Sequence, residues 1–167
     1  FHQIQSHGTV DPLVKETADH HREQEEKADG HAQAKEHRKA DDELLKFAVI
    51  LSRTQGKWVF CKHKDRTTYE VPGGHREEGE TIEETARREL YEETGAIEYD
   101  LDPVCVYSVQ KDSGQETFGM LYYAEVTSFE AELHSEIEHI ILTEDLVENW
   151  TYPDIQPKLM EEAERRV

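Results

Sequence analysis

The sequence is poor in cysteine and has no long apolar run. Its only cysteines, Cys61 and Cys105, each lie in an apolar stretch, so we expect two buried reduced thiols and no disulfide framework or cysteine-based zinc site. No apolar run approaches the length of about eighteen residues that spans a membrane, and no signal peptide is evident, so a soluble, cytoplasmic protein is expected. Because the chain begins with Phe1 and not Met, we expect a processed or truncated N-terminus.

Positive charge is also scarce. The 19 Lys and Arg residues stand against 38 Asp and Glu residues, which gives a net charge of −19. A surface of this sign repels nucleic acid and anionic membranes, so neither is expected as a partner. It also repels a nucleotide, which would need bound cations or a local basic patch to stay on the protein.

Residues 1–43 differ in composition from residues 44–167. They hold six of the ten His residues, few large apolar residues, and no Cys, Trp or Tyr. Asp11 followed by Pro12 is a typical helix start, so the sequence predicts a polar, His-rich, helical N-terminal extension. Its thin apolar face needs a partner surface, or the segment is partly disordered. The His spacings fit no standard metal site.

Apolar patterning in residues 44–167 predicts one strand-rich domain, which is long enough to form its own core. The first expected hairpin joins residues 44–51 and 57–63, and the second joins residues 104–110 and 115–128. Two further short strands are expected at residues 69–71 and 139–142. A helix is expected at residues 81–94, and a closing amphipathic helix runs from Pro153 or Pro157 to Arg166. This order of elements predicts an α+β fold.

The helix at residues 81–94 has clear start and stop signals. Thr81 can cap its first turn, and Glu84, three residues later, completes a capping box. Gly95 stands where a left-handed residue often ends a helix. One apolar stripe is expected on this helix, formed by residues spaced four apart: Ile82, Ala86 and Leu90.

Three carboxylates gather on one face of the same helix. Glu89, Glu92 and Glu93 lie at positions i, i+3 and i+4, so their side chains are neighbours and repel each other. A bound divalent cation that prefers oxygen ligands, Mg²⁺ or Mn²⁺, would relieve this repulsion. The alternative is an ordinary solvated face with ion pairs such as Glu84 with Arg88. The helix alone leaves both interpretations open.

The stretch from Gly74 to Ala96 resembles the Nudix box, Gly-x5-Glu-x7-Arg-Glu-U-x-Glu-Glu-x-Gly-U, where U is a bulky aliphatic residue. The matching residues are Gly74, Glu80, Arg88, Glu89, Leu90, Glu92, Glu93 and Gly95. Ala96 departs from the pattern because it is small, and Ile97 is expected to fill the same space. The resemblance implies a Nudix α/β/α sandwich with a mixed sheet over residues 44–167.

The resemblance also implies a chemistry, the hydrolysis of a nucleoside diphosphate linked to another group, with Mg²⁺ or Mn²⁺ as the cofactor. By the same resemblance, Glu89, Glu92 and Glu93 are expected to be catalytic residues and metal ligands. Which of these glutamates is the general base stays open. The Gly73 or Gly74 carbonyl supplies a further ligand. The expected bracing residues are Arg88 for the glutamates and Glu80 for the loop. A metal ligand outside the box is left open among Glu116, Glu125, Glu136 and Glu138.

Substrate-binding residues are expected outside the box. A small basic cluster before the glycines, Lys62, Lys64 and Arg66, is a candidate for phosphate contact together with Gly73, and solubilising loop charge is the alternative. Five aromatic residues are candidates for stacking on the nucleotide base, and the alternative for each is packing in the core: Phe47, Tyr107, Phe118, Tyr122 and Trp150.

Within the family, the chain resembles MutT-like nucleotide hydrolases, the YtkD-like group among them, in residues 62–66 shortly before residues 69–74 and in the closing residues 150–153. That similarity makes an oxidised purine triphosphate such as 8-oxo-dGTP the first expected substrate. ADP-ribose, dinucleoside polyphosphates and RNA 5′ ends stay open. A nucleotide sensor that does not cleave its ligand is a second hypothesis, and a partner-binding or assembly role of residues 1–43 is a third. The oligomeric state is also open, with a homodimer among the alternatives.

Overall fold

The structure is a computed structural model that describes residues 9–10, 42–133 and 136–166. Its strands are β1 (Thr9–Val10), β2 (Leu45–Thr54), β3 (Lys57–His63), β4 (Gly73–His75), β5 (Ala96–Gln110), β6 (Glu116–Phe129) and β7 (Ile137–Thr143). The named helices are α3 (Ile82–Thr94) and α4 (Gln156–Arg166). Apart from β1, which pairs with the end of β5, the predicted helical extension falls almost entirely outside the described residues.

The strands form one mixed sheet in the order β1-β5-β6-β2-β3-β7, with β4 attached to β2 beside this path. β2 runs parallel to β6 on one edge. Its other edge is shared, because β4 pairs with residues Phe47, Ala48 and Val49, whereas β3 pairs only with Arg53 and Thr54 at the far end. Beyond that hairpin β3 leaves β2 and pairs along its length with β7. The glycine-rich segment therefore joins the sheet at its central strand.

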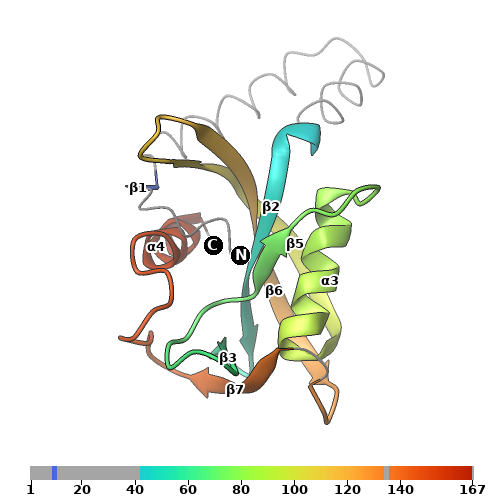
Figure 1. Ribbon diagram of the computed structural model, residues 1–167. Helices are drawn as coiled ribbons and strands as arrows, with labels where there is room; N and C mark the ends of the chain where they lie inside the picture. Colours follow the sequence, from blue (N-terminus) through green and yellow to red (C-terminus); the bar gives the residue numbers. More distant parts are fainter. Residues whose placement is uncertain (1–8, 11–41, 134–135, 167) are drawn as a thin grey trace.

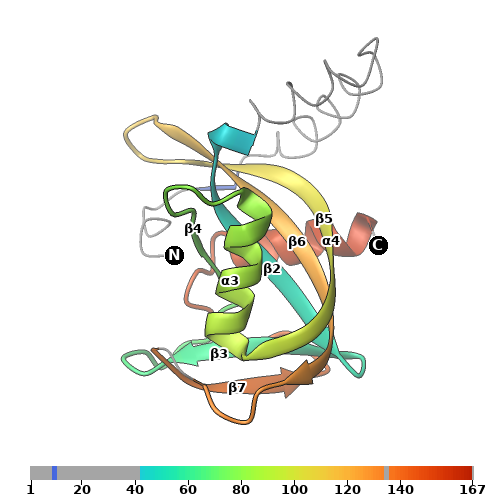
Figure 2. The same ribbon diagram turned by 90° about the vertical axis from the view of Figure 1, so that its right-hand side faces the viewer.

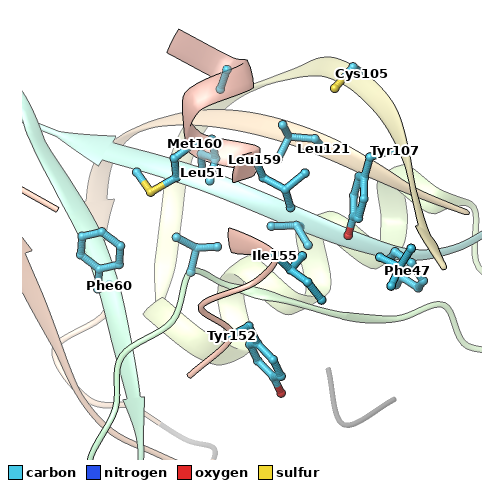
Figure 3. Close-up of a cluster of buried hydrophobic side chains, with 14 of the residues drawn as sticks. Phe47, Leu51, Phe60, Cys105, Tyr107, Leu121, Tyr152, Ile155, Leu159 and Met160 are labelled. Carbon is cyan, nitrogen blue, oxygen red and sulfur yellow. The ribbon is translucent and has the colours of Figure 1, made fainter. Parts of the chain in front are cut away.

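One helix covers each face of the sheet, as Figures 1 and 2 show. Side chains of β2 alternate between the two faces: Ala48 and Ile50 pack in the cluster under α3, and Val49 and Leu51 in the cluster under α4. Figure 3 shows the α4 side, where Leu159 is among the buried side chains. The predicted α/β/α sandwich with a mixed sheet is thus confirmed. Neither α3 nor α4, the helices named in the described residues, is long and apolar enough to cross a membrane.

The predicted helix at residues 81–94 forms as α3, with the predicted caps. The Glu84 backbone N–H donates to Oγ1 of Thr81 at 3.1 Å. Gly95 adopts a left-handed conformation with φ of 77° and donates its N–H to the Tyr91 carbonyl. The apolar stripe of α3 is buried against the sheet and consists of Ile82, Ala86 and Leu90. Local capping and one apolar face are therefore sufficient to define this helix.

The predicted strand at residues 69–71 is wrong. Tyr69 and Glu70 form only isolated bridges, to Trp150 and Cys61. The Val71 N–H donates to the Gln156 side chain at 3.0 Å and not to a neighbouring strand. The regular strand here is β4, four residues further along the chain.

The second hairpin begins earlier than predicted. β5 starts at Ala96 and passes through Pro103, because the register shifts between Pro103 and Cys105 and such an irregularity tolerates a residue that cannot donate a ladder hydrogen bond. β7 likewise extends beyond the predicted residues 139–142 at both ends.

The expectation for Ile97 is also wrong. Ile97 is 52% exposed, while Ala96 is 1% exposed and packs in the cluster under α3. Successive residues of a strand point to opposite faces, so the residue after Ala96 cannot fill the same space. A small residue therefore suffices at this position of the box.

Candidate active site

Gly74 provides the space for the side chain of Glu89. Gly74 pairs with Ala48 of β2, and α3 brings the Glu89 side chain to the position that a Cβ atom of residue 74 would take. A Cβ atom built on Gly74 would lie only 2.2 Å from Oε1 of Glu89. The first glycine of the box is therefore required by close approach of a carboxylate, and any side chain there would displace Glu89.

Glu93 lies one turn further along α3 and is buried, with 5% of its surface exposed. Its Oε1 accepts a hydrogen bond from the Gly73 N–H at 2.8 Å. Its Oε2 lies 3.0 Å from Nε2 of His63, at the end of β3. The glycine-rich segment, α3 and β3 thus meet at this one carboxylate.

A second buried carboxylate, Glu70, lies beside Glu93 and is fully buried. Its Oε1 is 3.1 Å from Nε2 of His63 and 3.1 Å from Nη1 of Arg66. Arg66 also donates to the hydroxyl of Tyr152 at 3.3 Å. Sequence reasoning did not single out His63 or Glu70 as site residues. The available signal for Glu70 was a lone acidic residue between apolar neighbours directly before the glycines.

Burial perturbs all three of these carboxylates. Desolvation, reinforced by the charge of Glu93, raises the pKa of Glu89 to about 8. Desolvation raises the pKa of Glu93 to about 7, although the hydrogen bond from Gly73 opposes it. Desolvation and then the charge of Glu93 raise the pKa of Glu70 to about 7. A bound cation would favour the ionised forms of these carboxylates.

Arg88 links the loop of the box to its helix. Its guanidinium group donates to both oxygens of Glu80, at 2.6 and 3.0 Å, to the His75 carbonyl at 3.0 Å and to Oε1 of Glu89 at 2.8 Å. Hydrogen bonding to Arg88 lowers the pKa of Glu80 to about 2. These contacts agree with the expected bracing roles of Arg88 and Glu80.

The donor atoms fit a hard divalent cation. Glu93 offers a buried carboxylate next to the Gly73–Gly74 backbone and Glu89 a largely buried one, with its side chain 13% exposed. The Glu92 side chain is 45% exposed and lies 3.4 Å from Nη1 of Arg88. Within the described part of the chain, no three His, Cys, Asp or Glu side chains are already gathered as a metal site. Mg²⁺ usually keeps several waters and needs only one or two protein carboxylates, so Glu89 and Glu93 suit it.

The basic cluster lies beside the site, but two of its members are engaged with acidic side chains. Lys62 forms an ion pair with Glu138 on β7, and Arg66 contacts Glu70. The Lys64 side chain is exposed. Phosphate contact by these residues and by Gly73 stays a prediction.

The candidate extra metal ligands are spread over the molecule. Glu116 begins β6, and Glu125 accepts a hydrogen bond from the Tyr123 hydroxyl at 2.7 Å. Glu136 and Glu138 are closer to the site, because Oε2 of Glu136 lies 4.0 Å from Nδ1 of His63 and Glu138 pairs with Lys62. These positions favour Glu136 and Glu138 as candidates for the extra metal ligand.

The candidate stacking aromatics occupy both faces of the sheet. Phe47 and Tyr107 pack together on the α4 side, with ring centroids 5.4 Å apart, and Figure 3 shows them at one end of that core. Trp150 packs edge-on against Phe60 on the same side. Tyr122 and Phe118 belong to the α3 side. The candidates therefore do not line one common pocket.

Comparison with protein families gives the class to which this fold and site belong. The model of the NUDIX domain matches residues 43–166. The match includes every strand and helix described above except β1. The chain belongs to the Nudix family.

Individual relatives show which Nudix proteins this chain resembles. The chain is 36% identical over 107 residues to a Bacillus subtilis (strain 168) protein provisionally named 8-oxo-dGTP diphosphatase YtkD, covering 62% of this chain and 65% of that protein. A crystal structure of a mutant of the Bacillus subtilis pyrophosphohydrolase BsRppH matches with a TM-score of 0.59 and 28% identity, over 72% of this chain and 82% of that one. The NUDIX domain of Shewanella oneidensis NrtR, complexed with ADP ribose, matches at 17% identity with a TM-score of 0.54, over 73% and 87% of the chains, and so supports the fold alone.

Proposed function

We propose that this protein is a Mg²⁺-dependent pyrophosphohydrolase that cleaves a nucleoside triphosphate to the monophosphate and pyrophosphate. An oxidised purine nucleotide such as 8-oxo-dGTP is the first substrate to test, since the relative YtkD is provisionally named for that activity. A cytoplasmic location agrees with such a substrate and stays a prediction.

One observation carries the proposal. Glu93 is buried and Glu89 is largely buried against the Gly73–Gly74 backbone, and desolvation raises their pKa values to about 7 and about 8. Two neighbouring carboxylates that lose solvent are unfavourable in a domain that only has to fold, even with Arg88 beside Glu89. A polyphosphate site needs this arrangement, because the metal neutralises the carboxylates and the phosphates together.

The protein groups have separable roles in this proposal. Glu89 and Glu93 would hold the metal, with Glu92 available from the exposed side of α3. Arg88 orients Glu89 through its 2.8 Å hydrogen bond, and Gly74 keeps the space that Glu89 occupies. When bound, Mg²⁺ withdraws charge from phosphate oxygens and supplies a water of lowered pKa. Which glutamate accepts the proton from that water stays open among the three.

A hydrolysis panel tests the proposal. The substrates are the four dNTPs, 8-oxo-dGTP, ADP-ribose, diadenosine polyphosphates and 5′-triphosphate RNA, each incubated with Mg²⁺ and resolved by anion-exchange chromatography. We expect one nucleoside triphosphate to yield its monophosphate and pyrophosphate in equal amounts. Glu93→Gln should reduce turnover by on the order of a hundredfold or more, as loss of a metal ligand requires. Glu161→Gln, which alters an exposed glutamate of α4, is the matched control.

The other outcomes separate the alternatives. Preferred cleavage of ADP-ribose, a dinucleoside polyphosphate or an RNA end would show that the protein is a pyrophosphohydrolase with a substrate other than a nucleoside triphosphate. Binding without cleavage, measured by calorimetry on the same panel, would favour the nucleotide sensor. Full activity of Glu93→Gln would contradict the assignment of the site.

A further inference from the structure

One ring nitrogen of His63 lies between two buried carboxylates. Nε2 is 3.0 Å from Oε2 of Glu93 and 3.1 Å from Oε1 of Glu70. An ionised carboxylate only accepts hydrogen bonds, so where these oxygens are charged the N–H of His63 must be the donor. The His63 side chain is itself only 15% exposed, and water therefore competes little for this contact.

We propose that His63, supported by Glu70 and Arg66, is a positioning residue that holds the Glu93 carboxylate in the orientation required for metal binding. The inference rests on the proposed function, because it assigns Glu93 to the metal. The Gly73 N–H holds one oxygen of Glu93, and His63 holds the other. With one donor on each oxygen the carboxylate cannot rotate freely, and each oxygen keeps a lone pair for the cation.

Glu70, the second carboxylate beside Nε2 of His63, is itself held by neighbouring side chains. Oε1 of Glu70 also accepts from Arg66 at 3.1 Å, and Arg66 donates to the Tyr152 hydroxyl at 3.3 Å. Polar contacts thus run from Tyr152, in the segment before α4, to the glutamate of the box helix. A positioning chain needs such a fixed end, since a mobile histidine could not fix the carboxylate beside it.

A purely structural role of Glu70 does not account for this arrangement. The backbone of Glu70 is already paired with Cys61 of β3 through two hydrogen bonds, at 2.8 and 3.0 Å. The loop is therefore attached to β3 without the side chain. A fully buried carboxylate adds a desolvation penalty that an apolar residue would avoid, so its contact with His63 needs another explanation, which the positioning of Glu93 provides.

Three substitutions at His63 test the proposal. His63→Gln places an amide N–H where Nε2 now lies. His63→Asn has the same chemistry but is too short to reach Glu93, and His63→Leu has no donor. Ser113→Leu is the control, because Ser113 is a neutral, exposed residue in the turn between β5 and β6. Melting curves establish that each variant folds, and if His63→Leu does not, His63→Asn carries the comparison.

The first readout is Mn²⁺ affinity, measured by electron paramagnetic resonance on the full chain without nucleotide. Loss of a residue that orients a metal ligand weakens binding by roughly ten- to a hundredfold, so His63→Leu and His63→Asn should fall in this range. His63→Gln should stay within about threefold of wild type, as expected for a retained donor. The second readout is turnover, where we expect kcat to fall by about tenfold or more in His63→Leu with little change in the nucleotide KM.

The outcomes distinguish this inference from the proposed function. Wild-type Mn²⁺ affinity in a folded His63→Leu, or equal losses in the Gln and Leu variants, would overturn the positioning role while hydrolysis by the wild type stands. Weakened affinity in Ser113→Leu would overturn it as well, because the effect would then not be specific to His63. Failure of the wild type to hydrolyse the whole panel would refute the proposed function, and failure to bind Mn²⁺ would overturn the inference independently.

Discussion

Arg88 and Glu80, eight residues apart, form a two-pronged ion pair in which Nε donates to Oε2 at 2.6 Å and Nη2 to Oε1 at 3.0 Å. The same guanidinium group donates to the His75 carbonyl and to Glu89. Both side chains are largely shielded, at 22% and 15% exposure. This pair therefore connects the loop of the box to the face of α3 that carries the carboxylates.

Glu80→Gln should lower the free energy of unfolding by about 1–2 kcal/mol, because a charge-assisted bidentate contact becomes a neutral one. Urea denaturation at neutral pH measures this change. Glu83→Gln is the control, since it removes an exposed ion pair with Arg87 at 3.7 Å and should change stability by less than about 0.5 kcal/mol. Equal effects of the two substitutions would contradict the importance of the Arg88–Glu80 pair.

The same pair predicts an acid dependence of stability. The pKa of Glu80 is lowered from 4.5 to about 2 by its hydrogen bond with Arg88, so its stabilisation is fully present above pH 4.5 and is lost as the pH falls towards 2. The difference in unfolding free energy between wild type and Glu80→Gln should shrink progressively over this interval. Urea titrations at pH 6, 4 and 3 measure it, and a difference that stays constant would contradict the lowered pKa.

The raised pKa values of Glu89 and Glu93 predict that the stability of the metal-free protein changes with pH in the opposite direction. Their folded-state values are about 8 and about 7 against an ordinary 4.5, so the folded state binds more protons than the unfolded state between these limits. Stability of the protein in EDTA should therefore fall as the pH rises from 4.5 to 8. Added Mg²⁺ should reverse the fall, because it replaces the bound protons. Thermal melts across this range, with Glu89→Gln showing a flatter profile, provide the measurement.

Gly74→Ala should abolish most activity with a smaller effect on folding. The new methyl group would lie 2.2 Å from Oε1 of Glu89, so the carboxylate must move, and a displacement of about 1 Å near a reacting centre lowers turnover by on the order of a hundredfold. Initial rates at saturating Mg²⁺ measure the effect. Gly114→Ala, in an open turn with φ of 87°, strains the backbone without touching the site, and its activity should be that of wild type.

Leu90→Ala should destabilise the whole domain. Leu90 is fully buried under α3, and such truncations lower the free energy of unfolding by roughly 2–5 kcal/mol. Chemical denaturation measures the loss, and Tyr91→Ala, at a residue that is 41% exposed, should change stability much less. A loss below about 1 kcal/mol at Leu90 would mean that α3 does not depend on its packing against the sheet.

The helix of the box was fully predictable because its determinants are local. The capping pair Thr81 and Glu84 and the left-handed Gly95 lie in the sequence next to the ends that they define. The strand predicted at residues 69–71 failed because the partner of the Val71 N–H is Gln156, 85 residues away, and no local pattern contains that information.

The sequence by itself determined the family, the box helix and the positions of its glutamates, because spacing along one helix decides which side chains share a face. Only the tertiary structure decided which other residues meet them. His63 reaches Glu93, thirty residues away, because β3 leaves β2 after two paired residues and joins β7. Glu70 joins the same cluster through the bridge of its backbone to Cys61. Strand pairing between distant segments, and not residue spacing, therefore places these groups beside the candidate metal ligands.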